Sequence, residues 1–296
     1  MGFWGVSLYS GDFALDLKSA VAAVARLPLK DEEIVEALRS TESAAADHDD
    51  DPDHTTFWLV LADQLARRGL YPNEVRKRAL EIIDGGRDTE RLKSLGAREP
   101  DLRKRQAQLA EIKAALVAAT PKARKTLAKP QPLVMSEGEV LVYPTSAGKP
   151  INPYFKSKSL IPNWHQDGFG TLAVIETGHV FGYLAWLRVA TLDGARAEPL
   201  GMDAIWQEPL WTLCRPGTCS PPHFRRMELQ RIGKVSIDRD ALAGLFPNLP
   251  SPRSAAIIDK SIANHLNVGP KPALSDRQRQ REAVQGLARI ARPANA

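Results

Sequence analysis

The chain has 296 residues, a length that suits two domains better than one small module. Its content of 43% hydrophobic and 25% charged residues is ordinary for a globular protein and argues against wholesale disorder or a coiled-coil rod. The formal net charge of +5 decides nothing about partners. No apolar run approaches the roughly 18 residues needed to span a bilayer, so we expect no membrane partner. The first residues lack a basic region followed by an apolar core, so we expect no signal peptide.

The first 120 residues have the periodicity of helices, because apolar residues recur at steps of three and four. Six segments show this spacing: Asp12–Leu27, Ile34–Leu38, Phe57–Leu65, Asn73–Ile83, Asp88–Leu95 and Leu102–Leu116. The helix that begins near Phe57 is apolar on nearly every side, which predicts that it is central and buried. Asp12, Thr55 or Thr56, and Asp101 are the predicted N-caps. Ala44–Asp53 is predicted to be a polar, acidic loop.

A proline-rich and basic segment, Pro121–Pro132, is predicted to be an interdomain linker, and after it the apolar period changes to two. Glu139–Tyr143 is a predicted strand, and the run from Phe169 to Val189 predicts a hairpin with a loop at Glu176–His179. Further strands are expected at Leu210–Cys214 and Met227–Ile237, and helices at Ser254–Leu266 and Ser275–Arg292.

The fold class is therefore predicted as α+β: an N-terminal helical bundle followed by a mainly β domain, a curled sheet or small barrel, with C-terminal helices. The predicted divisions are residues 1–125 for the bundle, 133–270 for the mainly β domain and 271–296 for a basic C-terminal tail.

Two groups of residues have types that bind metals. Cys214, Cys219, His223 and the distant His179 could provide four ligands, but a zinc site usually has two closely paired knuckles. Asp47–His54 holds five carboxylates and two imidazoles but lacks the glycine turn of a calcium loop. We therefore predict free thiols, a solvated acidic loop, and neither a metal nor a cofactor. The scarcity of cysteine fits a reducing cytoplasm.

The sequence contains no Gly-x-Ser-x-Gly, no His-Glu-x-x-His and no glycine-rich phosphate loop, so no catalytic residue is predicted. His165 lies close to Asp167, and with His179 these side chains could form a polar pocket in an enzyme of an unfamiliar kind. A polar loop explains His165 equally well. Whether the protein is an enzyme stays open, with the balance against it.

The basic residues carry more information. Residues 64–130 hold 17 basic and 8 acidic residues, whereas residues 1–63 hold 4 basic and 13 acidic residues. The two segments cancel, which indicates either internal pairing or a dipolar surface. The candidate binding residues for protein or nucleic acid are Arg67, Arg68, Arg76, Lys77, Arg103, Lys104 and Arg105. Solvated helix faces are the alternative interpretation, and the segment lacks aromatic residues among its charges for base stacking.

The opening Met1-Gly2-Phe3-Trp4-Gly5, with Tyr9, Ser10 and Asp12, resembles the start of a group of uncharacterised bacterial proteins that have an N-terminal Gly-x-Trp-Gly helical domain. The resemblance extends through Phe57–Ala62, Arg78–Asp84 and Arg103–Arg105. The strand at Glu137–Tyr143 is similar to the opening of immunity-type small β-barrel proteins, which neutralise toxins in bacterial competition. This chain departs from them by an insertion at Thr145–Asn163. Neither resemblance implies a catalytic residue.

These observations favour a non-enzymatic bacterial cytoplasmic protein that binds another protein by charge complementarity, in immunity, toxin–antitoxin or phage-defence systems. The alternative is a nucleic-acid-binding accessory protein that uses the basic surface of residues 64–130. A second alternative is an enzyme with an unrecognised site.

Overall fold

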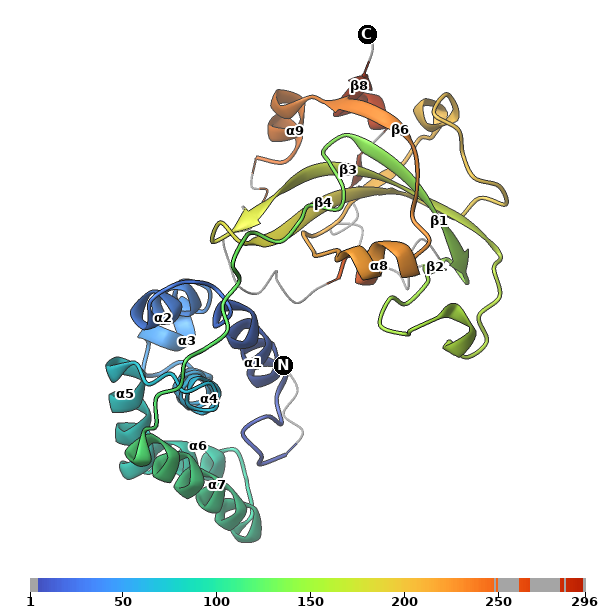
Figure 1. Cartoon of the computed structure of the whole chain (residues 1–296). Helices are drawn as coiled ribbons and strands as arrows, with labels where there is room; N and C mark the ends of the chain where they lie inside the picture. The colour runs from blue at the N-terminus through green and yellow to red at the C-terminus, as the bar shows by residue number, and fades with distance from the viewer. Residues whose placement is uncertain (1–4, 248, 250–260, 267–282, 285, 295–296) are drawn as a thin grey trace. The chain divides into compact units, whose positions relative to one another are not determined.

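The computed structural model describes residues 5–247, 249, 261–266, 283–284 and 286–294 (Figure 1). They fall into two compact units, one within Met1–Lys129 and the other within Pro130–Pro252 and Lys260–Ala296. The described part of the first unit is helical and that of the second is mainly β, so the α+β class is confirmed. The division after Lys129 lies inside the predicted linker.

Seven helices make up the described part of the helical unit: α1 Asp12–Val24, α2 Asp31–Arg39, α3 Ser43–Asp47, α4 His54–Ala66, α5 Asn73–Asp84, α6 Arg87–Ser94 and α7 Glu99–Ala118. Six were predicted, and α3 lies where a loop was expected. The predicted N-caps are wrong: Gly11, Asp53 and Arg98 occupy those positions, without a side-chain capping bond. Asp12 and Asp101 lie instead in the first turn, where a negative charge favours the helix dipole.

The core of the bundle is α4, every residue of which from His54 to Leu65 is buried. It packs against α1, α3, α5 and α7, so the prediction of a central helix is confirmed. The indole of Trp58 donates to the backbone carbonyl of Ala46 on α3 at 3.2 Å. Trp4 lies outside the described residues.

A buried ion pair joins α6 to α7. The Arg105 and Asp88 side chains are 3% and 1% exposed, and Arg105 Nε lies 2.6 Å from Asp88 Oδ2. A second donor, Arg105 Nη2, lies 3.0 Å from Asp88 Oδ1. Thr55 of α4 donates to the same carboxylate at 3.3 Å. A guanidinium buried to this degree requires such a partner, because the desolvation of an unpaired charge is costly.

The start of the predicted linker packs on the helical unit. Arg124 Nη1 donates to the carbonyls of Ala25 and Leu27, each at 2.8 Å, and its Nη2 donates to that of Leu29. The Leu127 amide donates to Arg26 O at 2.8 Å. Arg124 therefore donates hydrogen bonds to the carbonyl groups that follow α1, and its side chain stabilises the helical unit.

The second unit contains one curled antiparallel sheet in its described residues. The strands are β1 Glu139–Ser146, β2 Lys149–Pro150, β3 Gly168–Val180, β4 Leu184–Leu192, β5 Trp211–Leu213, β6 Gln230–Ile237, β7 Ala283–Val284 and β8 Ala291–Pro293. Their order is β7-β5-β4-β3-β1-β6-β8, and β2 pairs with β1. Helices α8 Pro221–Arg226 and α9 Arg239–Leu245, and short 3₁₀ helices such as η1 Lys158–Leu160, lie between and beside these strands.

Both faces of the central strands β1, β3 and β4 are largely buried, which explains their nearly continuous apolar runs. Alternate residues of β1 and β3 enter two separate cores: Val140 and Ala173 lie in one, and Leu141 and Leu172 lie in the other. Tyr143 shows how closely the second core is packed. Its ring lies over Gly170, where an added Cβ would be 2.3 Å from the ring carbon Cζ.

The hairpin predicted between Phe169 and Val189 exists as β3 and β4, but its predicted turn is wrong. Glu176–His179 continues β3, and the chain reverses at Phe181 and Gly182, which have φ angles of 51° and 71°. The Tyr183 amide closes this turn on Val180 O at 3.1 Å. Positive φ at both central residues matches the twist of the strands, although it is strained for phenylalanine.

The predicted C-terminal helix at Ser275–Arg292 is wrong in its described part, which forms β7, the 3₁₀ helix Leu287–Arg289 and β8. Leu287 and Ile290 are fully buried, because this segment completes the core beside α9. Most of the helix predicted at Ser254–Leu266 lies outside the described residues. None of the helices in the described parts combines the length and apolar character that crossing a bilayer requires.

We expect Arg105→Met to lower the free energy of unfolding by about 3–5 kcal/mol, because it removes the bidentate partner of the buried Asp88 carboxylate and leaves Arg91 Nη2, 3.6 Å away, as the neighbouring cation. Urea unfolding of the full chain, followed by helical circular dichroism, measures the change. Arg103→Met on the exposed side of α7 is the control, with an expected change within about 0.5 kcal/mol. Adding Asp88→Asn to Arg105→Met removes the stranded charge and should recover part of the loss. Equal stability of R105M and R103M would contradict the structural role of this pair.

Candidate anion-binding site

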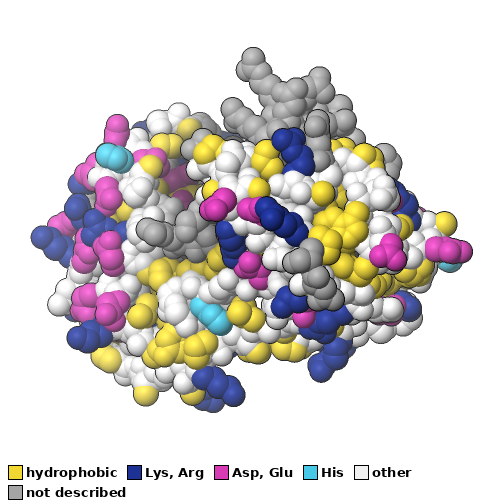
Figure 2. Space-filling view, turned by 90° about the horizontal axis from the view of Figure 1, so that it is seen from above, with side chains coloured by type: hydrophobic (Ala, Val, Ile, Leu, Met, Phe, Trp, Pro, Cys, Tyr) yellow, Lys and Arg dark blue, Asp and Glu magenta, His cyan; other side chains and the backbone are white. Residues whose placement is uncertain are grey.

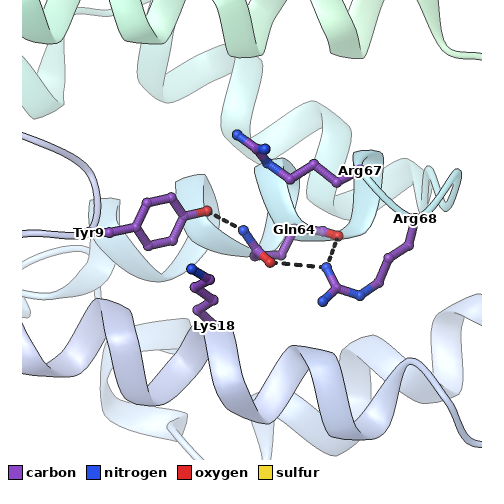
Figure 3. Close-up of a pocket in the computed structure, with 5 residues that line it drawn as sticks. All are labelled: Tyr9, Lys18, Gln64, Arg67 and Arg68. Atoms are coloured by element: carbon purple, nitrogen blue, oxygen red, sulfur yellow. Dashed lines mark hydrogen bonds between the residues drawn. The ribbon is translucent and has the colours of Figure 1, made fainter.

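A polar cavity of about 570 Å³ lies in the helical unit and is open to solvent. It is lined by Tyr9, Lys18 of α1, Gln64 of α4, and Arg67 and Arg68 directly after α4. In Figure 3 the Tyr9 hydroxyl, the Gln64 amide and the Arg68 guanidinium lie in a row, and Lys18 extends toward them from α1. Three of these five side chains are cations, so the cavity has the chemistry of an anion site.

The carboxylate of Asp63 accepts hydrogen bonds from three of the side chains that line the cavity. Arg67 Nε lies 2.9 and 2.8 Å from its two oxygens, and Gln64 Nε2 donates to Oδ2 at 3.0 Å. The Tyr9 hydroxyl donates to the same carboxylate and accepts from Gln64 Nε2 at 2.6 Å. These bonds compensate the charge of Arg67 through Nε and leave its terminal nitrogens for a ligand.

Burial, followed by the hydrogen bond to Asp63, raises the pKa of Tyr9 well above its ordinary value of about 10. Tyr9 therefore remains a neutral donor to the carboxylate throughout the physiological range of pH. Its ring also contacts a cation, since Lys18 Nζ lies 5.1 Å from the ring centroid.

Arg68, like Lys18, has no carboxylate within ion-pair distance among the described residues, whereas Arg67 is paired with Asp63. Its Nη1 donates only to Gln64, to the backbone oxygen at 2.7 Å and to Oε1 at 3.0 Å. Burial lowers the pKa of Arg68, and the charge of Arg67 acts in the same direction. A half-buried guanidinium bound to neutral acceptors is stabilised by an incoming anion.

The structure separates the seven residues predicted to bind. Arg67 and Arg68 reach the cavity, whereas Arg76 and Lys77 lie on α5 and Arg103 and Lys104 lie on the exposed side of α7. Arg105 does not belong to a binding surface, because it is buried against Asp88.

Several of the charges predicted to lie on the surface pair within the bundle. Lys77 and Lys104 lie 3.9 Å from Glu81 and Asp101. The acidic first segment and the basic second segment also pair with each other, as in Asp49–Arg87 at 3.2 Å. On the face shown in Figure 2, basic and acidic side chains are interspersed and do not form separate fields.

The other candidate residues do not gather into the sites that their types suggested. In the part of the chain that the structure describes, no three His, Cys, Asp or Glu side chains gather as metal ligands. Cys214 and Cys219 are both buried, and burial raises the pKa of Cys219 to about 12, which suppresses its thiolate.

His165 and His179 are not brought together, because His165 precedes the Gly168–Val180 strand and His179 lies near its far end, which at about 3.3 Å per residue places them tens of ångströms apart. Asp167 accepts from Thr145 Oγ1 at 3.0 Å and from the Ala147 amide, so it anchors a turn. The polar pocket suggested by these three residues does not form.

Sequence reasoning missed Tyr9, Lys18 and Gln64. Lys18 is one of only four basic residues in the acidic segment 1–63, and Gln64 lies in an apolar run, so neither has a charge pattern to mark it. Tyr9 belongs to the motif on which the resemblance to the Gly-x-Trp-Gly helical proteins depends, and this motif was the available signal.

A scan against protein-family models, a search of curated proteins and a search of solved structures all find no match for this chain. The two resemblances drawn from the sequence therefore stay predictions, and the geometry alone supports the proposals below.

We expect Tyr9 and Tyr143 to ionise only when alkaline pH unfolds the protein, because burial raises the pKa of both hydroxyls. The folded state keeps protons that the unfolded state releases, so stability falls as the pH rises through about 10. Spectrophotometric titration of tyrosinate measures this, and Tyr9→Phe and Tyr143→Phe should each remove one tyrosine from the late phase. A late phase of unchanged size in both variants would contradict the assignment.

Proposed function

We propose that this protein is a non-enzymatic binding protein whose helical unit takes a carboxylate-bearing segment of a protein partner at the Lys18–Arg67–Arg68 cavity. The observation that carries the proposal is the half-buried Arg68 guanidinium, which has neutral hydrogen-bond acceptors and no carboxylate within ion-pair distance in the described structure. An acidic side chain of a partner would supply that carboxylate, with Lys18 and the terminal nitrogens of Arg67 as further donors.

The arrangement of charge favours an acidic protein segment over nucleic acid at this cavity. Nucleic-acid affinity depends on several phosphate contacts along a strand, and therefore on an extended series of available cations. Here Lys77 and Lys104 lie near carboxylates of their own helices, and Arg105 is buried. One open cavity with three cations suits one or two carboxylates.

The proposed mechanism is occlusion, in which the bound partner is covered by a surface of complementary charge. An immunity, toxin–antitoxin or phage-defence system is the setting in which such covering would neutralise an active partner. We propose the cytoplasm as the compartment, and the scarcity of cysteine, two in 296 residues, supports this because small secreted domains are commonly rich in disulfides.

Arg68→Gln should weaken the binding of a fluorescently labelled oligo-glutamate peptide about tenfold, because it removes one charge-assisted hydrogen bond of about 1.4 kcal/mol. Fluorescence anisotropy of the full chain at low salt measures the dissociation constant. Lys18→Gln should act in the same direction with a smaller effect, because an exposed ammonium loses less on being left unpaired.

Lys77→Gln is the matched control, since it removes an exposed cation from α5 and should leave peptide affinity within about twofold. Equal weakening by K77Q and R68Q would show that the peptide responds to overall charge, and the proposal would fail. It would also fail if the wild-type protein bound inorganic phosphate at this cavity and not the peptide.

A further inference from the structure

The mainly β unit exposes aromatic and apolar side chains on the segment between β2 and β3. Tyr154, Phe155 and Leu160 are 59%, 36% and 58% exposed. Large apolar side chains that gather in one exposed segment commonly mark a binding surface. Nothing in the proposed carboxylate site uses them.

Cations of the same segment and of α8, whose Arg226 contacts Pro153, accompany the aromatic pair. Lys156 and Lys158 follow Tyr154 and Phe155 in the chain, and Arg225 and Arg226 lie in the last turn of α8. One carboxylate, Glu228, offsets them, through an ion pair with Lys158 at 2.9 Å. The set of four cations and one carboxylate therefore has a positive balance.

Contacts with α8 hold this segment in place. Arg226 Nη1 donates to the carbonyl of Pro153 at 2.9 Å, and the ring of Tyr154 packs edge to face on His223 with 5.0 Å between centroids. The Tyr154 amide donates to Asn152 Oδ1 at 3.0 Å, which closes a tight turn. The aromatic pair is thus presented by a hydrogen-bonded loop beside the cations of α8.

The protonation state of His223 indicates which residues provide the positive charge of this surface. Burial and the charge of Arg226 both lower the pKa of His223. This imidazole is therefore neutral at neutral pH, and the positive charge of the surface comes from lysine and arginine.

We propose that Tyr154, Phe155, Lys156, Arg225 and Arg226 form a binding surface for single-stranded nucleic acid. Exposed rings accept unstacked bases, and neighbouring cations accept the phosphates that connect them. A duplex would keep its bases paired and leave the rings unused. An acidic peptide would use the cations and would not require two adjacent exposed rings. Residues 64–130 of the helical unit lack such rings among their cations. The surface in the β unit therefore has both the rings and the cations that a single strand requires, whereas residues 64–130 have only the cations.

The test measures binding of the full chain to fluorescently labelled oligo(dT) and oligo(U) by anisotropy over a range of salt concentrations. Tyr154→Ala and Phe155→Ala should each raise the dissociation constant at least about fivefold, and Tyr154→Phe should retain the wild-type value because it keeps the ring. Lys156→Gln should lower the slope of log affinity against log salt by about 0.7, the value for one phosphate contact on a single strand.

Leu160→Ser and Lys234→Gln are the controls. The first removes an exposed apolar side chain from the same segment without removing a ring or a charge. The second removes an exposed cation from β6, where this strand pairs with the start of β1. The proposed surface lies in the chain after the end of β1. Both should leave oligonucleotide affinity within about twofold.

Three results would overturn the proposal. The first is no oligonucleotide binding at low salt. The second is a loss of oligonucleotide affinity in L160S together with binding of the wild-type protein to vesicles that contain phosphatidylserine. These two observations would indicate that the surface binds lipid. The third is a loss of oligonucleotide binding in R68Q and not in Y154A, which would place the contact in the helical unit. Since R68Q tests the carboxylate cavity and Y154A tests this surface, either proposal can fail without the other.

Discussion

Arg105 is almost completely removed from water in the helical unit, and the Asp88 carboxylate is what makes that burial tolerable. Removing a guanidinium from solvent costs several kcal/mol unless an acceptor of opposite charge replaces the water. The pair also connects three helices, because Asp88 lies on α6, Arg105 on α7, and Thr55 of α4 donates to the same carboxylate. The position of α7 against the central helix thus depends on charge compensation as well as on apolar packing.

The same requirement determines what the other basic side chains can do. Arg67 is compensated by Asp63, and Arg124 by the carbonyls that follow α1. Arg68 is half-buried as well, yet its hydrogen bonds reach only neutral oxygens of Gln64. The proposal that the cavity binds an anion rests on this difference, because Arg68 has no carboxylate partner of its own among the described residues.

The spacing of apolar residues along the chain predicted the helices and strands that depend on interactions between residues close in sequence. The apolar spacing around Phe57 indicated the central helix, and the change to a period of two indicated the sheet. Pairing between distant residues has no such pattern: Tyr9 and Asp63 meet across 54 positions, and Asp88 and Arg105 come from different helices. The hairpin turn was misplaced because Thr177 and Gly178 resemble a turn, whereas Phe181 adopts a positive φ that its side chain disfavours.

Charge counting selects a different part of the chain for nucleic acid than the surface proposed above. The strongest positive balance lies in residues 64–130, but folding buries Arg105 and places Lys104 close to Asp101. The segment before β3 has a weaker balance, yet it combines exposed rings with cations from α8. Recognition of single strands requires both groups at one place, since phosphate contacts alone leave the bases without a partner. Residue types that are separated in the sequence can meet this requirement only where the fold gathers them, as β2, β3 and α8 do here.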